Sequence, residues 1–590
     1  MKSFVSILIF CVLSTSLWSQ NAVAPAMGGG TQADPYQIET LENLFWITAP
    51  DSIVPDPNSA TRWTSHYIQT ANIDASPTQT WFPDGTGNFY GWLPIGQFAG
   101  RYDGVENTIS GLYINRTTNY NGLYGITTEV SVIQNLGLID VDITCSNLCT
   151  GAFVGQCFGQ IDNCFANVVI NGNGRTGGLV GELWLDGTIT NSYTDGTISG
   201  DAGGLVGLNR GTITDSYSTA DLTNSNDSKG GFVGSNNGTI DNCYAAGFVS
   251  GGGNGDAGGF VNYNTGTITN SHATGEVIPF AIRSGGGFAA LNDGTIAHCY
   301  ATGNVSSGAA GGFIGTQQSG GTVENSYATG NVTNAYSWFP MYAGGFIGIT
   351  YNACSISNCY SKGNVIRDHN DNSALLGGFI GKNQQGIITN SFSTGYVAYN
   401  GVANPEDKGF AGAVDTTGAY EMSGNYWDME TSFQYTTAGD AEGRLTSNMT
   451  SPYAANTYVN WDFEDVWAED FSYNINNGYP YLLQSSVSVD EEIFIQNITH
   501  LKNYPNPFKN VTTISFALPF NAECSLSIYN LRGQKIRTLL MDRSIDQDYK
   551  FSIIWDGKDN IGRDTFPGIY LYNLIINGEP TEYKKMIIIE

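Results

Sequence analysis

Aromatic and charged side chains gather in two stretches of the sequence that have the residue types of a ligand-binding site. The stretch at residues 332–343 is aromatic, and the stretch at residues 365–376 carries an arginine, a histidine and carboxylates. Aromatic rings stack on the apolar faces of sugars, while carboxylates and guanidinium groups form hydrogen bonds with hydroxyl groups. We therefore predict a site for a glycan or a protein. Its residues are Tyr336, Trp338, Phe339, Tyr342, Arg367, Asp368, His369 and Asp371.

Two alternatives to a binding site remain open. The aromatic side chains of residues 332–343 could simply cover the flank of the fold. A polysaccharide lyase or glycoside hydrolase would instead need a pair of carboxylates, or an Arg or Lys base, on one face. A non-catalytic binding function is preferred, because the sequence identifies no partner for any of the clustered carboxylates. These are Asp368, Asp371, Glu406 and Asp407.

The sequence predicts no cofactor. It contains five histidines, and none of them begins an H-E-x-x-H zinc motif. A D-x-N-x-N pattern begins at Asp368, but Ser373 stands where a calcium loop has glycine, and Phe379 stands where it has its distal glutamate. An ordinary Asx-rich turn is preferred there, with calcium binding as the alternative.

An internal repeat supplies the elements that must hold these side chains. A glycine pair followed by two apolar residues recurs every 25–33 residues, and a G-T-I-x-[ND]-[SC]-Y pattern follows at a nearly constant distance. The pairs begin at Gly177, Gly203, Gly230, Gly258, Gly286, Gly311, Gly344 and Gly377.

Each repeat contains three short strand-like segments separated by turns, in which Gly and Asn supply the positive φ angles of tight corners. One unit cannot bury its few apolar residues alone, so the units must stack. A β-propeller blade needs four strands and about 40 residues, more than these units have. We therefore predict an all-β chain whose main part is a parallel β-helix, or β-solenoid, of about ten coils.

Three repeats carry extra residues in the same phase, in the loop before the glycine pair. The extra residues are 332–343, 365–376 and 397–408. Insertions in the same phase of neighbouring coils emerge side by side on one face, which in repeat proteins is often the binding face. The candidate ligand-binding residues are thus expected to lie together.

The charge of the chain excludes several classes of partner. The formal net charge is −29, and because residues 501–590 hold 11 basic and 10 acidic residues, the first 500 residues carry −30. Nucleic acids and anionic lipid surfaces require clustered Lys and Arg. We expect no binding of nucleic acid. The expected partners are an extracellular polysaccharide or a surface protein of a host or a neighbouring cell.

The amino-terminal residues indicate export. Lys2 precedes an apolar run and an A-x-A site at Ala22–Ala24, which predicts a secretory signal peptide over residues 1–24. That run is too short to cross a bilayer, and no later run of about 18 apolar residues exists. No integral membrane segment is therefore predicted.

Ten cysteines in an exported chain raise the question of disulfides. One repeat position holds either serine or cysteine, and its cysteines belong to coils at least two apart, which exceeds the Cα separation of a disulfide. We expect this column to be buried and unbridged, while local bridges among Cys145, Cys149, Cys157 and Cys164 or between Cys354 and Cys359 remain open. The column contains Cys164, Cys243, Cys299 and Cys359.

The repeat resembles the GLUG motif of bacterial secreted and surface proteins over residues 150–415. The resemblance rests on the glycine pairs and on the continuation G-T-I-x-[ND]-[SC]-Y-[AS]-T-G-x-V. It implies an adhesin-like β-solenoid, but no particular activity, because the family also includes peptidases. Residues 25–149 are expected to form an N-terminal cap, with a helix at Leu41–Ile47, and the first coils. Residues 416–484 are expected to close the solenoid.

A different module occupies residues 501–590, after a linker at residues 485–500. Alternating strand-like runs separated by turn residues predict a small Ig-like antiparallel β-sandwich. The runs are Thr512–Leu518, Cys524–Asn530, Phe551–Trp555, Gly568–Ile576 and Lys585–Ile589.

The motifs of this module resemble those of the type A sorting domain of type IX secretion. The resemblance implies the type IX secretion machinery as a partner, and secretion or attachment at the outer-membrane surface of a Gram-negative bacterium. The residues that carry it are Tyr504, Pro505, Asn506, Pro507, Phe508, Gly533, Trp555, Asp556, Gly557, Gly568, Tyr570, Lys584 and Lys585.

Overall fold

The computed structural model describes residues 20–483 and most of residues 502–588. Residues 1–19 of the predicted signal peptide (residues 1–24) lie outside the described residues, and so do the predicted linker at residues 485–500 and its neighbours 484 and 501. The chain divides into two compact units, residues 1–484 and 485–590. Shorter segments outside the description are 224–227, 251–254, 279–283, 319, 335–340, 370–373, 400–403, 416, 418–419, 505, 507, 510, 518–522, 531–533, 545–549, 564, 577–578, 581–583 and 589–590.

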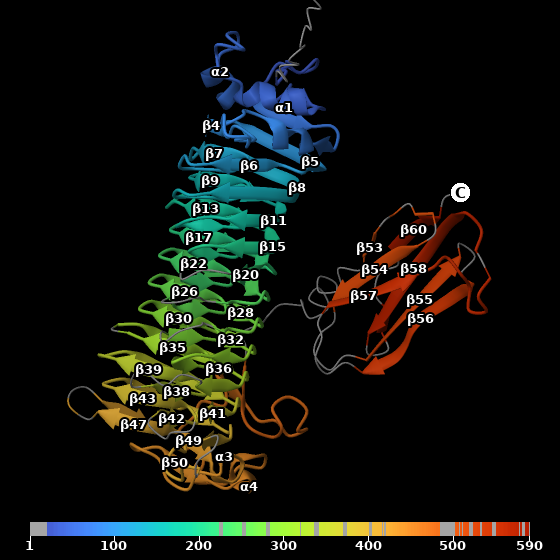
Figure 1. Ribbon diagram of the computed structural model, residues 1–590. Helices are drawn as coiled ribbons and strands as arrows, with labels where there is room; N and C mark the ends of the chain where they lie inside the picture. Colours follow the sequence, from blue (N-terminus) through green and yellow to red (C-terminus); the bar gives the residue numbers. More distant parts are fainter. Residues whose placement is uncertain are drawn as a thin grey trace, which may run out of the picture. The chain divides into compact units, whose positions relative to one another are not determined.

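The first unit is a parallel β-solenoid, as the repeat predicts (Figure 1). The strands of one coil pair in parallel with those of the coils before and after, so that Thr212 lies between Thr188 and Thr239. The three segments that the sequence predicts in each repeat are further divided at the corners. One coil runs through β16 (Ala202–Gly203), β17 (Val206–Asn209), β18 (Thr212–Thr214), β19 (Tyr217–Ser218) and β20 (Asp221–Thr223).

One column of twelve parallel strands contributes a strand from each successive coil. Ten of these strands, from Val154 onward, belong to the predicted repeat coils, which confirms the prediction of about ten. The other two lie before residue 150, in the first coils predicted within residues 25–149, which lack the glycine pair. The column contains β4 (Ile95–Phe98), β7 (Tyr124–Thr127), β9 (Val154–Cys157), β13 (Val180–Leu183), β17, β22 (Val233–Asn236), β26 (Val261–Asn264), β30 (Ala289–Asn292), β35 (Ile314–Gln317), β39 (Ile347–Tyr351), β43 (Ile380–Gln384) and β47 (Ala411–Asp415).

The interior of the solenoid is apolar and stacked in register. Ile189, Ile213 and Ile240 lie directly above one another and are fully buried. A column of phenylalanine rings runs from Phe232 to Phe410, with centroids 4.6–4.9 Å apart between neighbours. Burying one such side chain stabilises the fold by about 1.5–3 kcal/mol, and each ring is buried by the coils on either side of it.

Asparagines let the chain turn its corners, whereas the glycine pairs have a different role in stacking. Asn191, Asn242 and Asn270 occupy equivalent corners with φ angles of 48°, 52° and 49°, which confirms the prediction for the Asn turns. The glycine pair permits close stacking, because a Cβ atom on Gly259 would lie 2.1 Å from the carbonyl oxygen of Gly287 in the next coil. The repeat therefore needs glycine at this position.

The serine and cysteine column is buried, as predicted. The backbone N–H groups of Cys164 and Cys243 each donate a hydrogen bond to the serine hydroxyl of the next coil, at 3.1 Å. All eight cysteines whose side chains the structure describes are buried and free. The column therefore forms no disulfide, and the local bridges that the sequence left open are absent as well.

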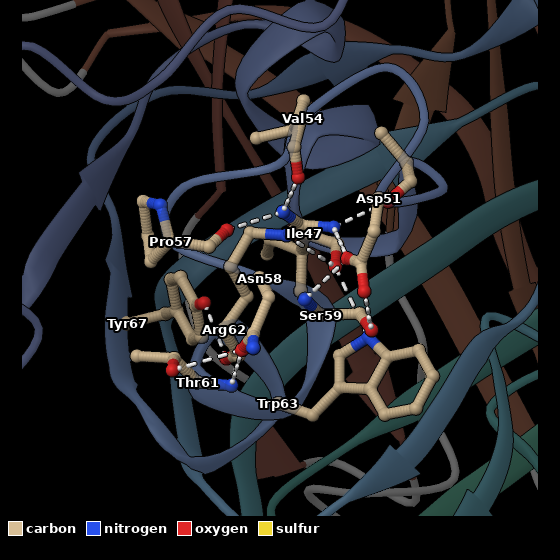
Figure 2. Close-up of polar contacts among 11 residues, drawn as sticks. Ile47, Asp51, Val54, Pro57, Asn58, Ser59, Thr61, Arg62, Trp63 and Tyr67 are labelled. Carbon is tan, nitrogen blue, oxygen red and sulfur yellow. Dashed lines mark hydrogen bonds and ion pairs between the residues drawn. The ribbon is translucent and has the colours of Figure 1, made fainter.

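The N-terminal cap contains α1 (Leu41–Thr48), which confirms the predicted helix, and α2 (Ser59–Thr64). The fully buried Arg62 fastens α2 to the preceding loop (Figure 2). Its guanidinium group forms an ion pair with Asp51 at 3.5 Å and donates hydrogen bonds to four backbone carbonyl groups, which are those of Ile47, Ala49, Val54 and Pro57.

The residues after 415 first continue the solenoid and then close it. Three strands, β48 (Glu421–Ser423), β49 (Tyr426–Asp428) and β50 (Glu442–Arg444), still pair in parallel with earlier or neighbouring strands. The short helices α3 (Met429–Ser432) and α4 (Thr446–Met449) lie among them. Aromatic rings of the closing segment then cover those of the last coils, in a cluster of Tyr458, Trp461, Trp467 and Tyr479 with Tyr360, Phe392 and Tyr426.

The second unit consists of two small antiparallel sheets with a common apolar core, as predicted. The five predicted strands are present, and three others were not predicted: β53 (Lys502–Tyr504), β56 (Lys535–Ser544) and β59 (Glu579–Pro580). No helix in the described part of the chain is long and apolar enough to cross a membrane. The sheets are β53 (Lys502–Tyr504), β54 (Thr512–Ala517) and β57 (Lys550–Trp555), and β56 (Lys535–Ser544), β55 (Glu523–Asn530), β58 (Gly568–Ile576), β59 (Glu579–Pro580) and β60 (Lys584–Ile588).

Candidate functional site

The three insertions lie in consecutive coils, and their first residues form strands. β37 (Val332–Asn334), β41 (Val365–Arg367) and β46 (Val397–Tyr399) pair in parallel within one four-stranded sheet. The first two insertions return through β38 (Tyr342–Gly344) and β42 (Leu375–Gly377), which are also neighbours. The structure thus brings the bases of the insertions together.

Tyr342 is the one predicted aromatic residue whose position the structure describes. Its ring is half-buried, with the Lys382 ammonium group 5.7 Å from the ring centroid. Burial raises the pKa of the Tyr342 hydroxyl, and Tyr351 adds to this effect. The hydroxyl group therefore remains a neutral hydrogen-bonding group at physiological pH. Tyr336, Trp338, Phe339 and Asp371 lie outside the described residues.

Sequence reasoning missed Lys382, although the repeat contains a signal for it. Lys382 lies five residues after Gly377, and its backbone pairs with that of Ile349 in the preceding coil. A fixed offset from the glycine pair therefore assigns it to the twelve-stranded column. Only the fold of the insertion shows that this position adjoins Tyr342.

Arg367 lies inside the fold rather than on its surface. Its side chain is fully buried, and its guanidinium group donates hydrogen bonds to the side-chain and backbone oxygens of Asn334. The Met341 sulfur lies 3.0 Å from the same nitrogen. These contacts join the first two insertions at their bases. Asp368 is exposed and His369 is half-buried next to it, so both are accessible among the described members of the predicted polar group.

The third insertion is fastened to the closing segment. The buried Gln434 donates hydrogen bonds from Nε2 to the backbone oxygens of Val397, at 3.0 Å, and Pro405, at 2.9 Å. Glu406 and Asp407 follow on the exposed side, and the Lys408 ammonium lies 3.4 Å from Asp407 Oδ2. Within the described residues, no group of three or more His, Cys, Asp or Glu side chains is arranged to hold a metal ion.

In the second unit, Asn506 and Phe508 of the predicted motif at residues 504–508 form hydrogen bonds with the strand β60. Asn506 donates a hydrogen bond from Nδ2 to the Lys585 carbonyl, at 3.0 Å, and accepts one from the Ile587 backbone N–H, at 2.9 Å. The backbone N–H of Phe508 donates to the Ile587 carbonyl at 2.9 Å. Two sequence motifs about 80 residues apart are thus joined. Tyr504 ends β53, whereas Pro505, Pro507 and Gly533 lie outside the described residues.

The other predicted motif residues form the core and one turn of this module. Trp555 is fully buried, with its ring edge-on to those of Phe508 and Tyr570 at 5.7 and 5.5 Å. Asp556 and Gly557 begin the following turn, where Asp556 lies 3.4 Å from Arg537. Gly568 begins β58 with a φ angle of 154°, Lys584 is half-buried and Lys585 is exposed.

Family comparisons match both parts of the chain. The model of the GLUG motif matches residues 172–199, 306–333 and 340–366. The model of the secretion system C-terminal sorting domain matches residues 502–590.

Comparisons with individual proteins cover shorter parts. The chain is 36% identical over 166 residues to halomucin of Haloquadratum walsbyi, which is 27% of this chain and 2% of halomucin. It is 34% identical over 145 residues to a putative Gly-rich membrane protein of Evansella cellulosilytica, 23% of this chain and 15% of that protein. The crystal structure of dimeric latent PorU from Porphyromonas gingivalis aligns with 15% of this chain and 9% of its own, at 22% identity and a TM-score of 0.14. That score carries no argument about fold.

Proposed function

We propose an adhesin-like function for this protein, which carries GLUG repeats on a β-solenoid and a type IX secretion sorting domain. That domain indicates secretion or attachment at the surface of a Gram-negative cell, and it implies interaction with the type IX secretion machinery. The proposal is that the solenoid is a non-catalytic scaffold. Its insertions at residues 332–343, 365–376 and 397–408 bind a glycan or a protein outside the cell.

One observation carries this proposal: the bases of the insertions are stacked on rigid strands. β37, β41 and β46 are consecutive in one sheet, and the buried Arg367 joins the first two insertions. A site built on paired strands holds its side chains more precisely than an isolated loop does. Tyr342 and Lys382 then provide an aromatic ring and a cation at the edge of this stack.

The proposal is tested with the double variant Trp338→Ala, Tyr342→Ala of the full chain. Retention of the protein by soluble polysaccharides in affinity electrophoresis, and by whole cells, is expected to fall severalfold while the thermal unfolding temperature stays unchanged. Tyr90→Ala serves as the matched control, because Tyr90 is 40% exposed and belongs to the N-terminal region. It should behave as the wild type.

The same mixtures are assayed for new reducing ends. Their appearance would favour the polysaccharide lyase or hydrolase over the binding protein, and Asp368, Asp371, Glu406 and Asp407 would be replaced next. A large loss of stability in the double variant would show instead that the aromatic side chains only support the fold.

A further inference from the structure

We propose that Phe433 and Tyr435 form a second binding platform, for the pyranose rings of neutral glycans. This inference rests on the proposed function and assigns a ligand class to residues that the sequence did not single out. Both rings project into solvent, with relative exposures of 62% and 64%. Phenylalanine is among the residues most often buried, and here an exposed phenylalanine and an exposed tyrosine are separated by one residue.

The residue between the two rings anchors them. Gln434 is fully buried and holds the base of the third insertion through hydrogen bonds from its side chain to Val397 and Pro405. The side-chain oxygen of Gln434 also accepts a hydrogen bond from the Lys408 backbone N–H, at 3.0 Å, and the Trp427 indole donates to the Gln434 carbonyl at 3.0 Å. The backbone that carries the rings is therefore fixed from both sides before any ligand arrives.

The backbone at Phe433 is itself unusual. Its φ angle is +56°, in the left-handed region that a bulky residue rarely occupies. Phe433 terminates the short helix α3, a place where glycine is the common residue. Because the Phe433 ring is exposed, burial of the ring does not offset the strain of this backbone conformation. Strain that burial does not offset points to a function for the exposed ring.

Hydrogen-bonding groups lie beside each ring. The Tyr396 ring meets Phe433 edge-on, with centroids 5.5 Å apart, and the Tyr396 hydroxyl accepts a hydrogen bond from Asn404 at 2.8 Å. The backbone N–H of Tyr435 donates to the Glu406 carbonyl at 3.0 Å, which places the third insertion alongside the second ring.

These neighbours favour a neutral sugar as the ligand. The carboxylates of Glu406 and Asp407 are exposed and accept hydrogen bonds, which sugar hydroxyl groups donate. The same carboxylates repel uronic acids and sulfated sugars, and the Lys408 ammonium is already paired with Asp407. Exposed aromatic rings on a segment whose backbone pairs with that of Glu406 match a pyranose, which has an apolar face and a rim of hydroxyl groups.

The test uses the full chain and affinity electrophoresis in gels that contain mannan, xylan, xyloglucan or starch, with alginate and chondroitin sulfate as acidic counterparts. At least one neutral polysaccharide should retard the wild type. Phe433→Ala, Tyr435→Ala should raise the apparent dissociation constant about tenfold. The exchange Phe433→Tyr, Tyr435→Phe keeps both rings and should bind as the wild type does, and so should the control Tyr90→Ala.

Three results would overturn the inference: retardation by acidic polysaccharides alone, equal retardation of the double alanine variant, and no retardation of the wild type by any neutral polysaccharide. The proposed function of the insertions survives the first two results as glycan binding and the third as protein binding, and the Trp338→Ala, Tyr342→Ala variant tests both forms separately. If the double alanine variant fails to fold, Tyr435→Ser leaves Phe433 and the Gln434 anchor in place and must still weaken retardation.

Discussion

His272 occupies a position that holds tyrosine in the coils on either side. Its ring stacks between those of Tyr244 and Tyr300, with centroids 5.2 and 4.6 Å away. Burial lowers the pKa of His272 to about 3. The folded protein therefore keeps this imidazole neutral at pH values where an unfolded chain, with a pKa of about 6.5, binds a proton.

Acidification should therefore destabilise the solenoid through His272. The stability that the neutral imidazole contributes is complete above pH 6.5 and is lost as the pH falls from 6.5 towards 3, by up to about 1.4 kcal/mol per pH unit. His272→Tyr should remove this part of the pH dependence. Urea midpoints at pH 7 and pH 4 measure it, because the remaining titratable groups are common to both proteins. Equal decreases in the two proteins would contradict the prediction.

At the scale of elements, the closing segment is held by its aromatic side chains. Trp467 is fully buried and packs against Trp461, with ring centroids 4.5 Å apart, and against Phe392 of the last coils at 6.0 Å. Truncation of a buried tryptophan costs about 3–5 kcal/mol. Each coil interacts mainly with its neighbours, so the loss of stability should be confined to the closing segment and the coils next to it.

Trp467→Ala should therefore expose the closing segment to proteases without unfolding the solenoid. Limited proteolysis followed by mass spectrometry is expected to give new cleavages within residues 446–482, while the far-ultraviolet circular dichroism is retained. Phe471→Ala is the control, because Phe471 is 75% exposed in the same segment. Cooperative unfolding of the entire first unit would be the contrary result.

Elements with a strong local pattern were predicted, and elements without one were not. The glycine pairs and the G-T-I segments locate most strands of the repeat, and α1 follows from its apolar run. β56, at Lys535–Ser544, was missed because it mixes arginines with leucines and shows no clean alternation. Its partner β55 supplies the pairing that makes it a strand, and that pairing is not a local property.

For the molecule as a whole, the chain divides into two compact units, and the match to the sorting domain lies entirely in the second. Deletion of residues 502–590 should leave the protein inside the cells of a host that has type IX secretion, because the sorting domain is removed. Cell fractionation and immunoblotting measure this. The variant Tyr342→Ala should be exported like the wild type. Export of the truncated chain would show that another segment directs secretion.

The architecture of this protein can be predicted from its amino-acid sequence. A β-solenoid follows from the repeat period and from glycines whose spacing is visible along the chain, since stacking needs only that each coil resemble the next. The sorting module followed from motifs of the same local kind. Even the single column of serines and cysteines was correctly predicted as buried and unbridged.

The side chains that are available for binding become visible only in the folded protein. Arg367, predicted on the surface, is buried beneath the insertions, whereas Phe433 and Tyr435, which the sequence did not single out, are exposed. Exposure depends on which neighbouring coil or segment covers a residue, and such coverage comes from parts of the chain that are distant in sequence. The repeat period assigns a residue to a strand. The exposure of its side chain to solvent and ligands depends on the segments that pack against that strand.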